Sequence, residues 1–273
     1  MYPIKSSLKK WQDKLSMAGI TSAKDEVIFL CQELIGFTRA DLVIVDEFDA
    51  KQYKTIDKAV NKRARHIPFG LVVGSSSFMG VKILENRHTL SPRPETELLC
   101  QYIIKEDKSK SVLDMCTGSG CIGLALRKNG FDNVTLCDVS RNALKCAKKN
   151  AKINGLKVKC IKSNMFESVV STYDIIVSNP PYIRHDDIKT LDKEVQNYDP
   201  KLALDGGQDG LKYYRIIAEK APEFLTRKGK LFLEIGKGQE NDVVVLLEKN
   251  FTNIVVYPDY AGINRIIKAE LKC

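Results

Sequence analysis

A short polar loop, Asn179-Pro180-Pro181-Tyr182, follows an apolar and largely β-branched run from Ile175 to Ser178. The run is typical of a buried strand, and the prolines end it because each fixes φ and lacks a backbone N–H donor. The loop should be stiff and should present the Asn179 amide, bare carbonyl oxygens and the Tyr182 ring at a strand's carboxyl end. This is an unusual set of groups for a plain connection, so the loop is a candidate functional site.

A glycine-rich turn lies nearer the N-terminus, between a predicted strand at 112–115 and a predicted helix at 122–128. Small residues let backbone N–H groups approach a ligand closely, although the same composition also suits a plain tight turn. The turn matches neither the dinucleotide-binding nor the triphosphate-binding glycine motif. The candidate ligand-binding residues are Asp114, Cys116, Thr117, Gly118, Ser119 and Gly120.

Polar side chains also follow the next two predicted strands. Asp138 comes where an acidic side chain can accept both hydroxyl groups of a ribose, and capping of the helix after Ser140 is the alternative. Asn164 and Met165 follow the third strand and can either flank an adenine ring or pack within a loop. Because ligands of parallel sheets bind beyond the carboxyl ends of the strands, we expect these groups and the Asn179 loop at one edge.

Strands and helices alternate from Ser111 onward, which predicts a doubly wound, Rossmann-like α/β sheet. We expect seven strands, of which the last two can form an antiparallel pair around Gly262. A long helix is predicted over 210–226. The expected strands are 112–115, 133–137, 157–161, 174–178, 230–235, 253–257 and 263–269.

The first part of the chain has the apolar periodicity of helices, with Leu8, Trp11 and Leu15 on one stripe. We predict a small helical bundle over 1–74, a hairpin and linker over 75–94, and the sheet domain over 95–273. Within the linker, residues 78–84 and 88–90 are expected to pair as the hairpin.

The composition is that of a globular protein with a basic balance. Lys and Arg number 43 against 34 Asp and Glu, and the resulting charge of +9 suits a phosphate-rich partner or a solvated basic surface. No apolar run approaches the roughly 20 residues that span a bilayer, and the N-terminus lacks an apolar signal region. The eight cysteines include no CxxC pair. We therefore expect a cytoplasmic, reduced protein without a metal site or a membrane partner.

Taken in order, these groups resemble those of class I S-adenosylmethionine-dependent methyltransferases, in the branch that methylates planar amino groups. The resemblance implies S-adenosylmethionine as cofactor and S-adenosylhomocysteine as product. It places Asp114 and residues 116–120 along the methionine part, Asp138 at the ribose, and Asn164 and Met165 at the adenine. It also implies that the catalytic and substrate-binding residues are Asn179, Pro180, Pro181 and Tyr182, with Asn179 bordering the cofactor as well.

A more specific resemblance runs nearly end to end. The segments Pro68-Phe-Gly-Leu-Val-Val-Gly74, Pro92-Arg-Pro-Glu-Thr-Glu97 and Asp199-Pro-Lys-Leu-Ala-Leu-Asp-Gly-Gly-Gln-Asp-Gly210 are similar to those of the release-factor glutamine methyltransferases, the PrmC or HemK family. The resemblance implies methylation of the side-chain amide N5 of the glutamine in the Gly-Gly-Gln loop of class I peptide-chain release factors. It further implies that residues 1–74 recognise the substrate protein and that no nucleic acid is required. We expect a monomer.

The chain departs from that family pattern at two positions. Cys116 stands where the family usually has Gly, and Asn164 where it usually has Asp. A side chain at 116 would cost roughly 1 kcal/mol if the backbone there has positive φ, so the departures bear on cofactor affinity. One alternative is a nucleic-acid methyltransferase acting on adenine N6 or guanine N2, which uses the same loop but needs base flipping. Another is a cofactor-binding module without catalysis.

Overall fold

The computed structural model describes residues 2–273, which divide into two compact units. One unit contains residues up to 75 together with Lys193–Tyr198. The other contains Ser76–Asp192 and Asp199–Cys273. The short segment Lys193–Tyr198 thus belongs to a unit whose other residues are distant from it in sequence. Within residues 2–273, no helix is both long and apolar enough to cross a bilayer.

Amphipathic helices around an aromatic core form the first unit. Its elements are β1 (Tyr2–Pro3), α1 (Ile4–Met17), α2 (Ala23–Ile35), α3 (Asp41–Ile44), β2 (Glu47–Phe48), α4 (Ala50–Arg63), α5 (Phe69–Val73) and α9 (Lys193–Tyr198). Trp11 of α1, Leu30 of α2 and Ile56 of α4 meet in its core with no exposed surface. Asp49 caps α4 in a capping box with Gln52, which satisfies two backbone donors at the start of the helix. The predicted N-terminal helical bundle is confirmed.

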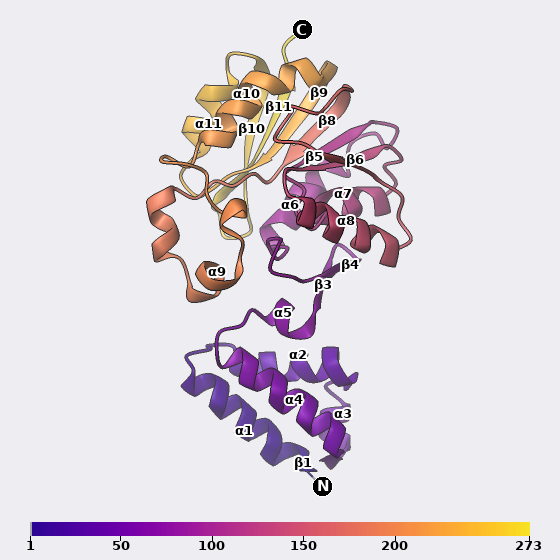
Figure 1. The fold of residues 1–273 in the computed structure, drawn as a ribbon, viewed down its shortest axis with the longest axis vertical. Helices are drawn as coiled ribbons and strands as arrows, with labels where there is room; N and C mark the ends of the chain where they lie inside the picture. Colours follow the sequence, from indigo (N-terminus) through magenta and orange to yellow (C-terminus); the bar gives the residue numbers. More distant parts are fainter. Residues whose placement is uncertain (1) are drawn as a thin grey trace. The chain divides into compact units, whose positions relative to one another are not determined.

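The second unit centres on a seven-stranded sheet in the order β10-β11-β9-β8-β5-β6-β7 (Figure 1). Its strands are β5 (Val112–Met115), β6 (Val134–Asp138), β7 (Lys159–Lys162), β8 (Tyr173–Ser178), β9 (Leu225–Glu234), β10 (Phe251–Pro258) and β11 (Asn264–Leu271). Strands β5 to β9 pair in parallel, whereas β11 runs antiparallel to both β9 and β10. The predicted doubly wound sheet with an antiparallel final pair is confirmed.

Helices cover both faces of this sheet. They are α6 (Pro94–Ile103), α7 (Cys121–Lys128), α8 (Arg141–Ile153), α10 (Lys212–Phe224) and α11 (Glu240–Leu247). Successive residues of a strand point to opposite faces, so Leu113 of β5 packs in the core that includes α10 and α11, while Val112 packs with α6, α7 and α8. In Figure 1, α10 and α11 accordingly lie together beside β9 to β11. The carboxyl ends of the parallel strands remain open to form a site.

The predicted hairpin is wrong in its position. The strands that pair are β3 (Ser75–Phe78) and β4 (Val81–Leu84), and residues 88–90 are not a strand. The turn falls at Met79 and Gly80 because both adopt positive φ, as a tight two-residue hairpin connection requires. Residues 85–91 instead form a loop.

Two boundaries near the middle of the sheet also differ from the prediction. The long helix α10 ends at Phe224 rather than 226, and β9 begins at Leu225 rather than 230. Leu225 pairs with Tyr173 of β8, so the neighbouring strand extends β9 through a Thr-Arg-Lys-Gly stretch whose composition is typical of a loop.

Candidate active site

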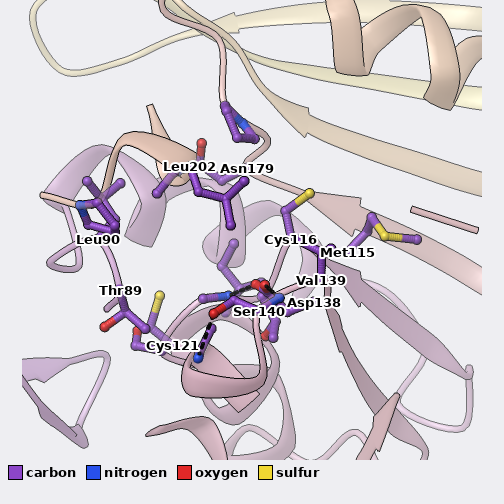
Figure 2. A pocket seen from close by; sticks show the side chains of 18 of the residues that line it. Thr89, Leu90, Met115, Cys116, Cys121, Asp138, Val139, Ser140, Asn179 and Leu202 are labelled. Atoms are coloured by element: carbon purple, nitrogen blue, oxygen red, sulfur yellow. Dashed lines mark hydrogen bonds between the residues drawn. The ribbon is translucent and has the colours of Figure 1, made fainter. Parts of the chain in front are cut away.

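A cavity of about 270 Å³ lies at the carboxyl ends of β5, β6, β7 and β8. The predicted site residues that line it are Cys116, Thr117, Gly118, Ser119, Asp138, Asn164, Met165, Asn179 and Pro181. Figure 2 shows Asn179 and Leu202 on one side of this cavity and Asp138, Val139 and Ser140 on the opposite side. Four chain segments that are distant in sequence therefore contribute to one pocket.

Asp138 joins the glycine-rich turn to the next helix. Its Oδ2 accepts a hydrogen bond from the Gly118 N–H at 2.9 Å, and its Oδ1 accepts one from the Ser140 N–H at 2.8 Å. The helix itself is capped by Ser140, whose Oγ accepts a bond from Ala143 N–H. Each carboxylate oxygen keeps further acceptor capacity toward the cavity. Burial raises the pKa of Asp138, and its backbone hydrogen bonds oppose that shift.

Asp114 lies beneath the turn and does not line the cavity. It is fully buried, and its Oδ2 accepts hydrogen bonds from the Thr117 hydroxyl and the Gly123 N–H. Its Oδ1 finds no hydrogen-bond partner among residues 2–273, and burial raises its pKa to about 7. Gly120 is likewise absent from the lining. Asp114 therefore shapes the turn from below, and a direct contact with a ligand stays a prediction.

Cys116 and Met165 form an apolar wall at the cavity. Both are non-glycine residues with positive φ, 60° and 48°, and their sulfur atoms lie 3.9 Å apart. Burial raises the pKa of the Cys116 thiol, so it stays protonated at neutral pH. The neighbouring Asn164 is exposed, and its Nδ2 donates to Glu167 at 2.7 Å.

The loop that follows β8 is held on both sides. Asn179 lines the cavity, and its Nδ2 donates to the Thr96 hydroxyl at 3.3 Å. The Tyr182 carbonyl oxygen accepts a hydrogen bond from Gln239 Nε2 at 3.1 Å. Pro181 lines the cavity, whereas Pro180 and Tyr182 do not. Stacking of the Tyr182 ring on a substrate therefore stays a prediction.

Comparison with known proteins identifies the family. Over 267 residues the chain is 39% identical to the release factor glutamine methyltransferase of Agrobacterium fabrum, covering 93% of this chain and 92% of the relative. The chain belongs to the release factor glutamine methyltransferase family. Two family models match as well, a PrmC N-terminal domain at residues 6–74 and a methyltransferase small domain at residues 94–198. The predicted family and its enzymatic class are confirmed.

Solved structures share the fold of the second unit with this family member. A methyltransferase from Pyrococcus furiosus superposes with a TM-score of 0.54 at 18% identity, covering 70% of this chain and 89% of that chain. A 16S rRNA N2 G1207 methyltransferase of T. thermophilus, solved with AdoMet and guanosine, gives 0.52 at 20% identity and covers 72% and 50%. At such identities the likeness concerns the fold alone, so it does not favour nucleic acid as the substrate.

Several residues at the cavity were not predicted from the sequence to be site residues. Thr89, Arg93, Thr96 and Leu202 line the cavity, and Thr96 also joins Asn179 to the buried Glu234 through hydrogen bonds. Thr96 stands in the quoted Pro-Arg-Pro-Glu-Thr-Glu segment, and Glu234 ends an apolar strand as Asp138 does. The position of Glu234, an acidic residue at the carboxyl end of a strand, could therefore have marked it as a candidate site residue from the sequence.

The segment 199–210 packs on the loop that follows β8. Ile183 N–H donates to the Leu204 carbonyl at 2.9 Å, and Gly206 N–H donates back to the Ile183 carbonyl at 2.8 Å. Arg93 reaches the same segment through an ion pair with Asp199 at 3.1 Å. The Pro92–Glu97 and Asp199–Gly210 segments therefore meet at the cavity, to which both contribute lining residues. Among residues 2–273, no three His, Cys, Asp or Glu side chains gather as a metal site.

Proposed function

We propose that this protein transfers a methyl group from S-adenosylmethionine to the side-chain amide N5 of the glutamine in the Gly-Gly-Gln loop of class I peptide-chain release factors. Asn179 carries the proposal, because its amide lines a cavity whose opposite side holds Asp138. Asn179 follows a buried strand and precedes two prolines, and such a rigid position suits an acceptor for the N–H groups of a planar amide. Membership of the release factor glutamine methyltransferase family supports the choice of amide.

The lining of the cavity fits S-adenosylmethionine. Asp138 offers free acceptor capacity for the ribose hydroxyl groups, and the 116–119 turn offers backbone and small polar groups for the methionine part. Met165 offers an apolar surface for the adenine. When bound, the cofactor supplies a methyl group already activated by its sulfonium charge.

The residues of the chain then have a positioning task. A glutamine amide is a weak nucleophile because its lone pair is delocalised into the carbonyl group. Asn179, which lines the cavity, would accept one N–H of the amide through its Oδ1. The Pro180 carbonyl, although Pro180 is outside the lining, is predicted to accept the other, so that the nitrogen is oriented toward the methyl group. Holding two reactants in line supplies on the order of 7–11 kcal/mol of a barrier. As the N–C bond forms, the S–C bond breaks to give S-adenosylhomocysteine. The methylated nitrogen is then strongly acidic and loses one proton to water, so no strong general base is needed.

The remaining assignments follow from this substrate. We assign recognition of the release factor to residues 1–74, which match a PrmC N-terminal domain. Release factors act in translation, so we place the reaction in the cytoplasm, with the enzyme as a monomer and S-adenosylhomocysteine as the second product. We assign no direct contact with nucleic acid.

A labelling experiment tests the proposed substrate. The protein is incubated with cofactor labelled in the methyl group and with a purified release factor, the same factor carrying Ala in place of the Gly-Gly-Gln glutamine, or bulk RNA and DNA. We expect label on the intact factor and none on its Ala variant. Label on nucleic acid alone would overturn the proposal, and label on both factor variants would overturn the choice of glutamine.

A further inference from the structure

A hydrogen-bonded chain of three side chains runs from the cavity into the core. Asn179 Nδ2 donates to Thr96 Oγ1 at 3.3 Å, and Thr96 Oγ1 donates to Glu234 Oε2 at 2.7 Å. Thr96 and Glu234 are 3% and 2% exposed, so water does not compete for these bonds. The three residues come from the loop after β8, from α6 and from the end of β9. Three separate elements therefore meet behind the proposed catalytic amide.

The number of protons that each group can donate sets the direction of these hydrogen bonds. A hydroxyl group has one proton to donate, and an ionised carboxylate can only accept. Because Thr96 gives its proton to Glu234, its oxygen can only accept from Asn179. The group of Asn179 that faces Thr96 must then be the Nδ2 amino group. Its Oδ1 acceptor is left for the cavity.

We propose that Thr96 and Glu234 are positioning residues that fix the orientation of the Asn179 side chain, so that its Oδ1 accepts an N–H of the substrate amide. The inference rests on the proposed function, because it assigns that acceptor to a glutamine amide. It also assigns a role to Thr96 within the Pro92–Glu97 segment. Reversal of the Asn179 amide would present a donor to the substrate N–H group, and the two donors would repel.

The surroundings of Glu234 make the orientation depend on pH. Burial raises the pKa of Glu234 to about 7, while its bond with Thr96, the charge of Arg265 on β11, and the nearby Asn179 side chain oppose the shift. The other titratable groups that face it are Glu95 and Cys100 of α6, Cys121 of α7, Tyr182 of the loop after β8 and Tyr214 of α10. The Tyr214 hydroxyl donates to the Glu234 carbonyl oxygen. A protonated Glu234 can donate to Thr96, which frees the Thr96 proton for Asn179 Oδ1. Turnover should therefore fall as the pH drops through about 7.

Substitutions at Thr96 test this series of hydrogen bonds directly. Thr96→Val keeps the shape and removes the hydroxyl, whereas Thr96→Ser keeps the hydroxyl and is the matched control. We expect Thr96→Val to lower kcat for release factor methylation about 100-fold, since misplaced reacting groups lose rate on that scale. Its cofactor affinity by calorimetry should match wild type, and Thr96→Ser should recover most of kcat. Full turnover by a folded Thr96→Val protein would overturn the inference.

Substitution of Glu234 tests the pH dependence. Glu234→Gln does not ionise in this range, so the acid limb of the kcat profile should disappear, while the glutamine oxygen can still accept from Thr96 and keep turnover at neutral pH. Glu97→Gln is the control within the neighbouring segment, because Glu97 accepts from the Met79 N–H and an amide oxygen there can still accept. It should keep the acid limb. An unchanged acid limb in Glu234→Gln would contradict the proposed chain.

One measurement does not depend on turnover. With 15N-labelled asparagine, the Asn179 side-chain signal of the wild-type protein should shift with a midpoint near pH 7, and the shift should be absent in Glu234→Gln. A signal that does not titrate in the wild type would overturn the inference even if methylation of the release factor is confirmed. An enzyme that leaves release factors unlabelled but shows the titration would contradict only the proposed function.

Discussion

Two residues at the cavity wall have backbone conformations that non-glycine residues rarely adopt. Cys116 and Met165 both have positive φ at the cavity wall. Such backbone costs on the order of 1–3 kcal/mol per residue and persists only where the surroundings impose it. The sulfur contact between the two side chains is one such constraint. A side chain at position 116 is unfavourable if the backbone there has positive φ, and the backbone of Cys116 does have positive φ in this structure.

Two substitutions at position 116 test that strain. Cys116→Gly removes about 1 kcal/mol of strain together with a small, partly buried group, so we expect nearly wild-type stability. Cys116→Val places a β-branched residue at φ 60°, and we expect a loss of about 1–3 kcal/mol in the free energy of unfolding. Urea unfolding measures both. A Val variant as stable as wild type would show that residue 116 does not hold positive φ.

What the sequence reveals about the site differs from residue to residue. Asp138 and Asn179 could be placed at one edge because each follows a strand of a predictable parallel sheet. Thr96 and Glu234 could not be paired, because they are 138 residues apart and only the tertiary fold joins them. Nor does the sequence tell that Asp114 lies under the turn, since strand position does not fix which side of a turn a side chain takes.

Among the elements, the segment 199–210 is the support of the loop after β8. Ile183 and Asp205 form a parallel bridge, and the Gly206 backbone lies against Tyr182. A Cβ at Gly206 would lie 2.8 Å from the Tyr182 Cα and carbonyl carbon, both of which are backbone atoms that cannot turn aside. The glycines of this segment therefore permit an approach that places the Asn179 loop.

Gly206→Ala tests this support. The added methyl group must push the loop, and a displacement of this size lowers turnover by about 100-fold where it misaligns reacting groups. We expect cofactor affinity to change little, because Asp138 and the glycine-rich turn belong to other elements. The control is Gly207→Ala, whose Cβ would meet only the Lys212 side chain, although its φ of 89° makes it destabilising. Equal turnover in the two variants would argue against the supporting role.

Element type was more predictable than element ends. Alternating apolar strands and helices specify the doubly wound sheet because buried parallel strands need apolar residues on both faces. The hairpin was misplaced because Met79 has positive φ, which its residue type does not suggest. The start of β9 was missed because its pairing with β8 begins at Leu225 and resumes at Lys230 after a register shift, which the local composition does not indicate.

At the scale of the whole molecule, the chain has two compact units whose unfolding can be followed separately. The single Trp of the sequence, Trp11, is fully buried in the first unit. Its emission therefore reports on that unit, while circular dichroism reports on both. Arg63 ties the same unit together, since its guanidinium binds Glu26 at 2.7 Å and Glu194 of α9 at 2.9 Å with a side chain that is 4% exposed.

Arg63→Ala should destabilise the first unit selectively. Removing one partner of a buried ion pair leaves the other charges uncompensated, which typically costs about 3–5 kcal/mol. Arg39→Ala is the matched control, because it breaks an exposed ion pair with Asp25 in the same unit and should cost at most about 1 kcal/mol. In urea, the Trp11 emission should change at lower concentration in Arg63→Ala than in Arg39→Ala. Coincident emission midpoints in the two variants would show that the Arg63 cluster does not hold α9 and the N-terminal helices together.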